Sequence, residues 1–225
     1  MTTTPARLGL FGGTFNPIHV GHLRAAEEAA EVLALERVVF LPSAIPPHKA
    51  AACGDVIAPA CHRLEWVRLA TEGNPRFAVD ALELEREGPS YSVDTLRTFR
   101  ERGVETVFLI GQDAFAEIGS WHEPETLFAL THFAVFPRTS DANGTLAEWI
   151  PDRVKGEIVL GPDGRSGRHA RAGTWIRLLS IRPLDVSASD LRARLRAGRS
   201  VRYLVPETVR RAILESGAYA AKEEH

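Results

Sequence analysis

The chain has 225 residues, of which 44% are hydrophobic and 25% are charged, and its formal net charge is −2 at pH 7. This composition excludes a largely disordered chain, a collagen-like chain and a disulfide scaffold, because the apolar content suffices for a core and only two cysteines are present. The near-zero charge argues against general nucleic-acid binding, and no apolar run approaches the ~20 residues that span a membrane.

The first part of the chain predicts a strand, a helix and a second strand. The apolar run Leu8–Phe11 is followed by Gly12 and Gly13, which predict a turn. Residues 20–35 are rich in Ala, Glu and Leu and favour a helix, and Val38–Leu41 is a second apolar run. A strand, a helix and a strand in this order are typical of a βαβ unit, whose two strands run parallel.

Further helices and strands follow along the chain. We expect helices at 59–72, 90–102, 189–197 and 207–216. We expect extended segments at 77–84, 107–110, 133–136 and 175–179. Residues 139–173 are dominated by turn-forming and polar residues, so we expect mostly surface loop there, with one strand at 158–160. Residues 220–225 are expected to be frayed.

These elements together predict an α/β fold, namely a doubly wound, Rossmann-like parallel sheet with a helical C-terminal cap. We expect a single domain over residues 1–225. Its core would cover about 1–183, including the polar region 139–173, and a helical subdomain would cover about 184–219. The start of the chain shows no long apolar signal core, so we expect a cytoplasmic protein with no membrane partner and no nucleic-acid partner.

The connection between the first strand and the first helix, residues 12–22, is the first candidate for a ligand site. In a doubly wound sheet such a loop lies at the carboxyl end of a strand, where ligands bind. Its glycines permit close approach of the backbone, and the following helix start favours a phosphate group. The segment is neither a Walker A loop nor a dinucleotide fingerprint, because the residues GGTFNPIHVGH match neither pattern.

His19 and His22 stand three residues apart at the start of the helix, so their side chains can face the same way. Three interpretations remain open from spacing alone. The imidazoles could donate hydrogen bonds to phosphate oxygens, they could pack or cap as ordinary histidines, or they could bind a metal ion. The metal interpretation is the weakest, because no HExxH pattern and no suitably placed carboxylate accompanies them.

The segment closely resembles the nucleotide-binding signature of bacterial nicotinate-nucleotide adenylyltransferases, which belong to the nucleotidyltransferase superfamily with an HxGH-type motif. Nine positions match that signature: Gly12, Gly13, Thr14, Phe15, Asn16, Pro17, His19, Gly21 and His22. Later segments resemble the family in the same order and spacing: residues 46–49 (PPHK), 89–92 (PSYS), 110–113 (IGQD), Trp121, 186–192 (VSASDLR) and 203–206 (YLVP).

The resemblance implies a single nucleotidyltransferase domain that transfers AMP from ATP to nicotinate mononucleotide, giving deamido-NAD and pyrophosphate. The phosphate group of the mononucleotide can act as the nucleophile without a general base, because its second pKa of ~6 leaves it largely ionised at neutral pH. We therefore expect direct in-line attack with no covalent enzyme intermediate, and catalysis by positioning and charge stabilisation. Mg²⁺ is expected to be carried by the ATP phosphates, with no metal held by the protein alone and no tightly bound cofactor.

The resemblance also implies roles for individual residues. The expected catalytic residues are His19, His22, Lys49 and Arg192. The expected ATP-binding residues are Gly12, Gly13, Thr14, Phe15, His19, His22, Gly111, Asp113, Ser187 and Arg192. The expected residues for nicotinate mononucleotide are Asn16, His48, Lys49, Ser92, Trp121 and His122.

Several alternatives accompany these expectations. Ser187 and Asp190 have the spacing of a helix capping box, so Ser187 could be an N-cap only. Ser92 and His122 depart from the threonine and tyrosine common in the family, which alters the expected pyridine site. The acceptor could instead be nicotinamide mononucleotide or another phosphate, or the chain could be a catalytically inactive nucleotide-sensing protein. A homo-oligomer is compatible with the sequence.

Overall fold

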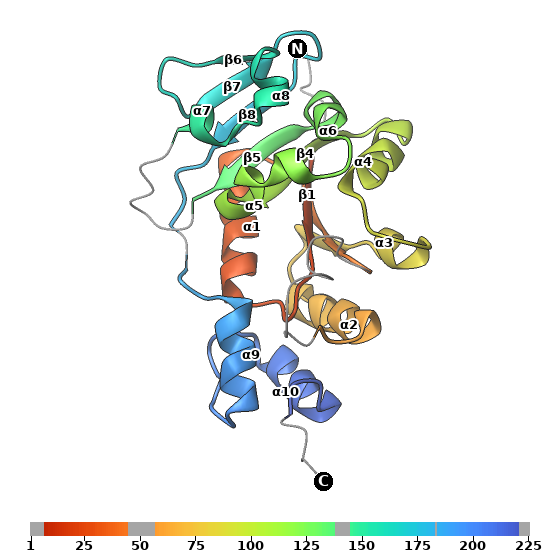
Figure 1. Ribbon diagram of the computed structural model, residues 1–225. Helices are drawn as coiled ribbons and strands as arrows, with labels where there is room; N and C mark the ends of the chain where they lie inside the picture. Colours follow the sequence, from red (N-terminus) through yellow and green to blue (C-terminus); the bar gives the residue numbers. More distant parts are fainter. Residues whose placement is uncertain (1–6, 45–56, 138–144, 183, 221–225) are drawn as a thin grey trace. The chain divides into compact units, whose positions relative to one another are not determined.

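The computed structural model describes residues 7–44, 57–137, 145–182 and 184–220 (Figure 1). Its strands are β1 (Arg7–Gly13), β2 (Arg37–Pro42), β3 (Phe77–Val79), β4 (Glu105–Gly111), β5 (His132–Phe136), β6 (Ile158–Leu160), β7 (Ser166–His169) and β8 (Trp175–Leu178). Its helices are α1 (Val20–Val32), α2 (Ala60–Thr71), α3 (Leu82–Glu85), α4 (Ser92–Glu101), α5 (Gln112–Ala116), the 3₁₀ turn η1 (Ile118–Ser120), α6 (Pro124–Leu130), α7 (Leu146–Trp149), α8 (Asp152–Lys155), α9 (Ala188–Arg196) and α10 (Glu207–Ser216).

The strands form one sheet with the hydrogen-bonded order β3-β2-β1-β4-β5-β8-β7-β6. β4 pairs in parallel with β1 and with β5, and β5 pairs in parallel with β8. β7 pairs antiparallel with both β6 and β8. The chain builds outward from β1 first toward β3 and then toward β8, which is the doubly wound order. The predicted α/β, Rossmann-like class is therefore confirmed.

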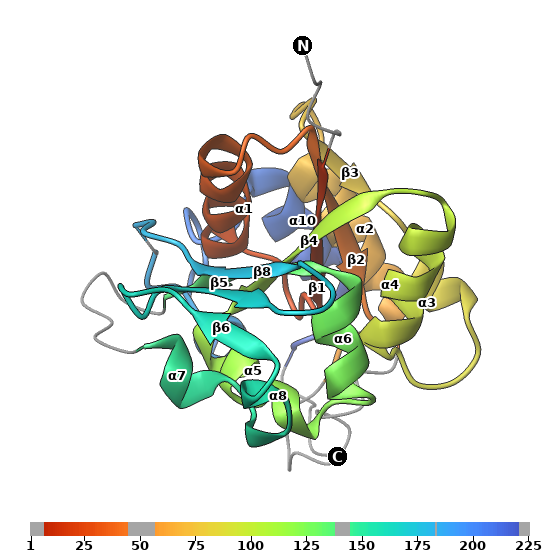
Figure 2. The ribbon, with the colours of Figure 1, turned by 90° about the horizontal axis from the view of Figure 1, so that it is seen from above.

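The chain divides into two compact units, and each is described by itself. The first unit comprises Met1–Gly12, Ala25–Val39 and Tyr91–Pro183. Its centre is β4 and β5, whose continuous apolar runs are buried, as in parallel strands covered on both faces. Helices α4 and α6 lie side by side in this unit (Figure 2). The Phe133 ring lies 5.0 Å from Phe128 and 5.7 Å from Phe115, between centroids, so an aromatic cluster fills the core.

The prediction for residues 139–173 is wrong in large part. The expected strand at 158–160 is present, but α7, α8 and β7 also lie in this region. β7 has the sequence SGRH, which carries no apolar alternation, and it is held by antiparallel pairing with β6 and β8. Leu146 and Val154 are buried, so α7 and α8 contribute apolar side chains to the unit. The sequence signal was missed because both helices have only four residues.

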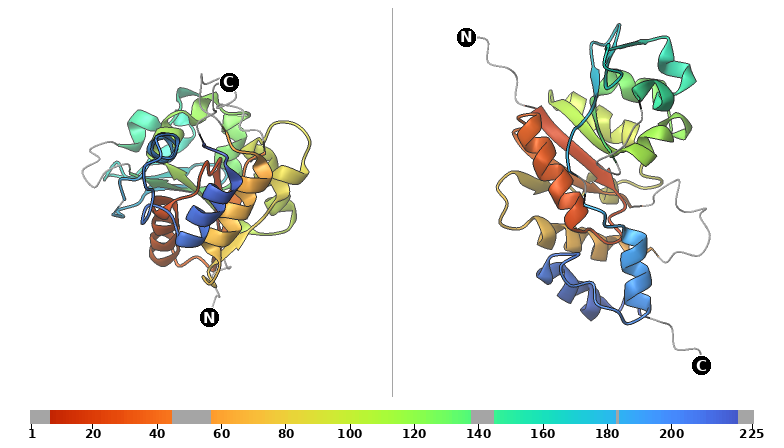
Figure 3. Two further views of the ribbon diagram at one scale, coloured as in Figure 1. Left: turned by 90° about the horizontal axis from the view of Figure 1, so that it is seen from below. Right: turned by 90° about the vertical axis from the view of Figure 1, so that its left-hand side faces the viewer.

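The second unit comprises Gly13–Arg24, Phe40–Ser90 and Leu184–His225. Helices α2 and α10 lie side by side in it (Figure 3). Trp66 on α2 is buried, and its ring lies 5.7 Å from the ring of Tyr219, which follows α10. Gly217 ends α10 in the left-handed conformation at φ 61°, a helix stop that suits glycine.

Other boundaries agree with expectation to within a few residues, and α10 begins and ends where predicted. The extended segment expected at 77–84 is a strand only over Phe77–Val79, because the chain turns at Asp80 and forms α3. The division into a core of about 1–183 and a helical subdomain of about 184–219 stays a prediction, as does fraying at 220–225, which lies almost wholly outside the described residues. Among the described helices, none is long and apolar enough to cross a membrane.

Candidate functional site

The loop between β1 and α1 is the centre of the candidate site, and in the second unit its residues are largely buried. Thr14, Phe15, Asn16 and His19 are each at most 8% exposed. Phe15 has φ 45°, and a Cβ on Gly13 would lie 3.2 Å from the Phe15 ring. Glycine at position 13 therefore leaves the space that the aromatic ring occupies.

His19 and His22 face each other at the start of α1. Their ring centroids lie 3.6 Å apart with an angle of 27° between the ring planes. The backbone N–H of His19 donates to Nδ1 of His22 at 3.2 Å. Because Nδ1 of His22 accepts, the proton of the neutral ring lies on Nε2, which can then donate to a ligand. The first HxGH histidine thus fixes the tautomer of the second.

Gly21 makes this stacking possible. A Cβ at position 21 would lie 3.0 Å from Nδ1 and 3.1 Å from Cε1 of His19, closer than ordinary contacts. Burial lowers the pKa of His19 to about 4, so its imidazole is neutral at pH 7. In the part of the chain that the structure describes, the buried Nδ1 of His19 has no hydrogen-bond partner. A buried and unsatisfied polar atom at a helix start is typical of a ligand site.

Asn16 links three segments of the second unit. Its side-chain oxygen accepts from the backbone N–H of Ala58 at 3.0 Å and from the hydroxyl of Tyr219. Its backbone carbonyl accepts from Nη1 of Arg192 at 2.8 Å. The side-chain oxygen of Asn16 therefore has two partners inside the protein. The sequence predicted only contact of Asn16 with the mononucleotide.

Arg192 and Ser187 lie at the amino end of α9. Ser187 is the N-cap, and its hydroxyl accepts from the backbone N–H of Asp190 at 3.1 Å. This bond confirms the capping interpretation and leaves the phosphate role of Ser187 a prediction. Arg192 is 6% exposed and also donates to the Ser189 hydroxyl at 3.1 Å. Its guanidinium thus holds the Asn16 carbonyl and the first turn of α9 together.

Arg63 has an organising role that the sequence analysis did not reveal. It is 1% exposed and donates to three backbone carbonyls: Ala58 at 2.9 Å, Thr14 at 2.7 Å and Ala44 at 3.0 Å. These carbonyls belong to three different loops of the second unit. A single planar fork with five donors can satisfy such a set, and lysine cannot. Tyr219 was likewise missed, because nothing local distinguishes it from a packing residue.

The remaining predicted residues of the first unit occupy the ends of its strands and helices. Gly111 ends β4, and Asp113 follows in the first turn of α5. Ser92 is the first residue of α4. The Trp121 ring meets Phe108 edge to face at 6.3 Å.

His122 stacks on Tyr91 with 4.3 Å between ring centroids, and it lies 3.6 Å from a Glu123 carboxylate oxygen. Gly12 lies close to Phe108, because a Cβ there would meet that ring at 3.3 Å. His48 and Lys49 lie outside the described residues. Their roles in binding and catalysis therefore rest on the sequence.

Comparisons with known proteins agree with one another. A family model described as cytidylyltransferase-like matches residues 10–194. A protein of Geobacter sulfurreducens named probable nicotinate-nucleotide adenylyltransferase is 44% identical over 216 residues, covering 95% of this chain and 98% of the relative. A protein of the same name from Chromohalobacter salexigens is 41% identical over 219 residues, covering 96% and 97%.

Solved structures show the same fold at low identity. The Plasmodium falciparum nicotinic acid mononucleotide adenylyltransferase complexed with NaAD has a TM-score of 0.69 at 15% identity. The same parasite protein complexed with APC has a TM-score of 0.66 at 14% identity. Each covers 95% of this chain and 97% of the solved one. At this identity the likeness establishes the architecture.

Proposed function

The chain belongs to the cytidylyltransferase-like family, and within it to the nicotinate-nucleotide adenylyltransferases, and from this premise we propose that it transfers AMP from ATP to nicotinate mononucleotide. The products are deamido-NAD and pyrophosphate. The observation that carries the proposal is the stacked pair of His19 and His22 at the start of α1, in which Nδ1 of His22 accepts from the backbone N–H of His19.

The reaction requires correct positioning of the two substrates and does not require a general base. The phosphate of the mononucleotide is already ionised near neutral pH, since its second pKa is ~6. It attacks the α-phosphorus of ATP, the bond to the β-phosphate oxygen breaks, and pyrophosphate leaves with the electron pair. No covalent enzyme intermediate forms. Mg²⁺ carried by ATP would offset the charge of its phosphates.

The two histidines act as hydrogen-bond donors in this scheme. The amides of Val20, His22 and Leu23 already donate to backbone carbonyls, so a phosphate at this helix start is bound chiefly by side chains. His19 is neutral because of its burial, and His22 donates from Nε2. Preorganised donors of this kind stabilise charge that develops in the transition state, and losing one costs ~10²–10³ in turnover. We assign to Lys49 and Arg192 the positive charge that stabilises the phosphates.

The assignment of individual residues to the two substrates is part of the proposal. We assign to ATP the residues Gly12, Gly13, Thr14, Phe15, His19, His22, Gly111, Asp113, Ser187 and Arg192. We assign to nicotinate mononucleotide the residues Asn16, His48, Lys49, Ser92, Trp121 and His122. The cytoplasmic location and the oligomeric state stay predictions.

The deciding assay follows pyrophosphate release with ATP and either nicotinate or nicotinamide mononucleotide. Donors facing the ring carboxylate would leave the amide of the competitor unpaired, at ~1–3 kcal/mol per group. We expect kcat/KM to be at least ~10-fold higher for the nicotinate substrate. Equal use of the two substrates would refute the preference for nicotinate and would leave the adenylyltransferase activity in place. ATP binding with no pyrophosphate release would point to a nucleotide-sensing protein.

Two variants separate the roles of the acid-binding residues. Ser92→Ala removes a donor and should narrow the preference for the acid. Trp121→Ala removes a ring that positions the pyridine and should weaken both substrates alike. If Ser92→Ala leaves the preference for nicotinate over nicotinamide mononucleotide unchanged, other donors bind the ring carboxylate.

A further inference from the structure

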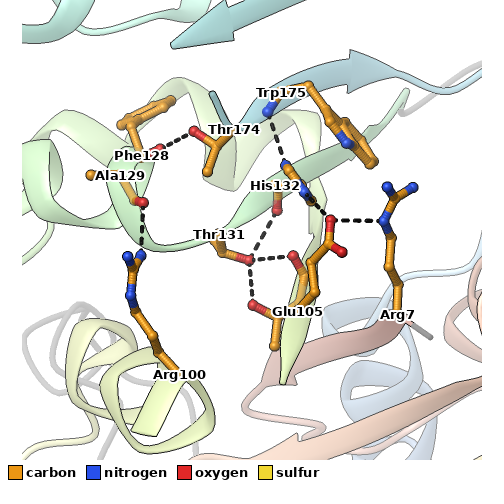
Figure 4. A network of polar contacts seen from close by, with 10 residues as sticks. Arg7, Arg100, Glu105, Phe128, Ala129, Thr131, His132, Thr174 and Trp175 are labelled. Carbon is orange, nitrogen blue, oxygen red and sulfur yellow. Dashed lines mark hydrogen bonds and ion pairs between the residues drawn. The ribbon is translucent and has the colours of Figure 1, made fainter. Parts of the chain in front are cut away.

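A pocket of about 580 Å³ lies in the first unit at the amino ends of its parallel strands. The first residues of β1, β4 and β5, namely Arg7, Glu105 and His132, line it (Figure 4). Residues of β6, β7 and β8 complete the lining. The residues assigned to ATP in this unit lie instead at the carboxyl ends, where Gly12 and Gly111 stand. The volume is in the usual range for small-molecule sites, ~300–1,000 Å³.

The register of the strands puts the polar side chains of the pocket on one face of the sheet. Arg7 pairs with Glu105 across β1 and β4. Arg168 pairs with Trp175 across β7 and β8, and Arg177 is two residues further along β8. Residues opposite each other, or two apart on one strand, share a face. The alternate residues Gly167 and Ile176 are buried, so Arg168 and Arg177 stand on the exposed face of this ribbon.

A hydrogen-bonded network fixes the floor of the pocket. Oε1 of Glu105 accepts from Nε of Arg7 and from Nε2 of His132, both at 2.8 Å (Figure 4). The backbone N–H of Trp175 donates to Nδ1 of His132 at 3.0 Å, so the proton of the neutral ring lies on Nε2. Burial raises the pKa of Glu105, but the bonds from His132 and Arg7 outweigh it and hold that pKa below its usual value. One oxygen of the carboxylate, Oε1, therefore accepts from both partners.

The guanidinium groups of the pocket make few ion pairs with carboxylates. Among the described residues, Arg168 and Arg177 have no carboxylate partner, and Arg7 uses only Nε toward Glu105. The Arg177 guanidinium lies over the Trp175 ring at 4.5 Å from the centroid, which orients it. Three arginines against one carboxylate leave a formal charge of 3 − 1 = +2 in the lining, with His132 neutral. Planar guanidinium forks match phosphate oxygens in pairs.

We propose that this pocket is a second, non-catalytic anion site that binds a small phosphate-bearing molecule through Arg7, Arg168 and Arg177. The phosphate group is the recognised part. Trp175 already stacks on His132, with 4.6 Å between ring centroids, and carries Arg177 over its ring. A nucleobase would have to displace these partners in order to stack there.

The experiment uses inorganic pyrophosphate as the probe and the full chain carrying His22→Ala, which removes a donor of the proposed catalytic site. Binding is followed by calorimetry and by tryptophan fluorescence, since Trp175 lies in the pocket. In this background we expect R168Q/R177Q to weaken pyrophosphate binding at least ~10-fold, because two charge-assisted contacts are lost. The matched control R199Q/R211Q removes the same charge at exposed positions outside the pocket and should leave binding unchanged.

Two further arms complete the test. Trp175→Phe should abolish the fluorescence response and keep the calorimetric signal within a few-fold. AMP should bind no more than ~10-fold tighter than pyrophosphate, because the pocket recognises the phosphate group and not the nucleoside. The proposal is overturned if R168Q/R177Q binds pyrophosphate as the control does, or if AMP binds far more tightly. Because no readout here requires turnover, a failed transferase assay would leave this test standing, and R168Q/R177Q in the natural chain should keep its pyrophosphate-releasing rate.

Discussion

The His19 and His22 rings lie nearly parallel at 3.6 Å between centroids, and the backbone N–H of the first residue donates to Nδ1 of the second. This arrangement fixes the orientation of the His22 ring before any ligand arrives. His22 offers one directed donor, and His19 is kept neutral by burial. The pair therefore works as an oriented hydrogen-bonding group rather than as a double positive charge.

The first prediction tests the oriented donor of His22. His22→Ala removes it and should lower turnover at least ~10²-fold, as for the loss of one preorganised donor. His22→Gln places an amide N–H near the position of Nε2 and should recover part of the rate. The measurement is kcat from pyrophosphate release, with thermal unfolding as a check on folding. Near-normal turnover in His22→Ala would favour simple packing over phosphate contact.

A second prediction concerns the space beneath the His19 ring. Gly21→Ala places a methyl group 3.0 Å from Nδ1 of His19, so the ring must move. We expect kcat to fall at least ~10-fold, since misplacement by about 1 Å can cost ~10² in rate. Gly156→Ala is the matched control, because a Cβ there meets nothing within 4 Å. Equal kcat in the two variants would show that the ring position does not matter.

The third prediction is a pH dependence of stability. The folded pKa of His19 is about 4, against 6.5 for an unperturbed histidine. Between these values the unfolded chain binds a proton that the folded chain does not, so the free energy of unfolding falls as pH drops from about 6.5 toward 4. The full loss for this residue is about 3 kcal/mol, reached below pH 4.

Urea unfolding across this pH range measures the effect. His19→Asn should flatten the slope of unfolding free energy against pH over this window. A residual slope should remain, because burial also lowers the pKa of His132. An identical slope in the variant and the natural chain would show that His19 titrates normally in the folded protein.

A fourth prediction concerns the hydroxyl of Tyr219. Tyr219→Phe removes the donor to the Asn16 side chain and leaves the Ala58 amide bond in place. We expect a loss of ~1 kcal/mol in unfolding free energy, the usual size for one buried hydrogen bond. Tyr203→Phe is the control, because Tyr203 is 85% exposed. Equal melting temperatures of the two variants would contradict the prediction.

The sequence was most informative where structure is encoded locally. The apolar runs at 107–110 and 133–136 predicted buried strands, which became β4 and β5. The spacing of His19 and His22 predicted their proximity, because residues three apart on a helix are neighbours. Gly103, in the left-handed conformation, follows α4 as the predicted helix stop.

What could not be predicted depends on partners distant along the chain. β7 is polar and becomes a strand only by pairing with its neighbours in the sheet. Arg63 resembles any helical arginine until three loops present their carbonyls to it. The double use of the Asn16 side chain depends on residues 58 and 219, which no local pattern connects to it.

The bond between Tyr219 and Asn16 joins residues 203 positions apart, near opposite ends of the sequence. During synthesis the ribosome completes the first βα connection long before it reaches α10. The loop between β1 and α1 therefore receives this partner only after residue 219 has been synthesised. A chain truncated before position 219 would carry the whole HxGH signature and still lack this bond to Asn16.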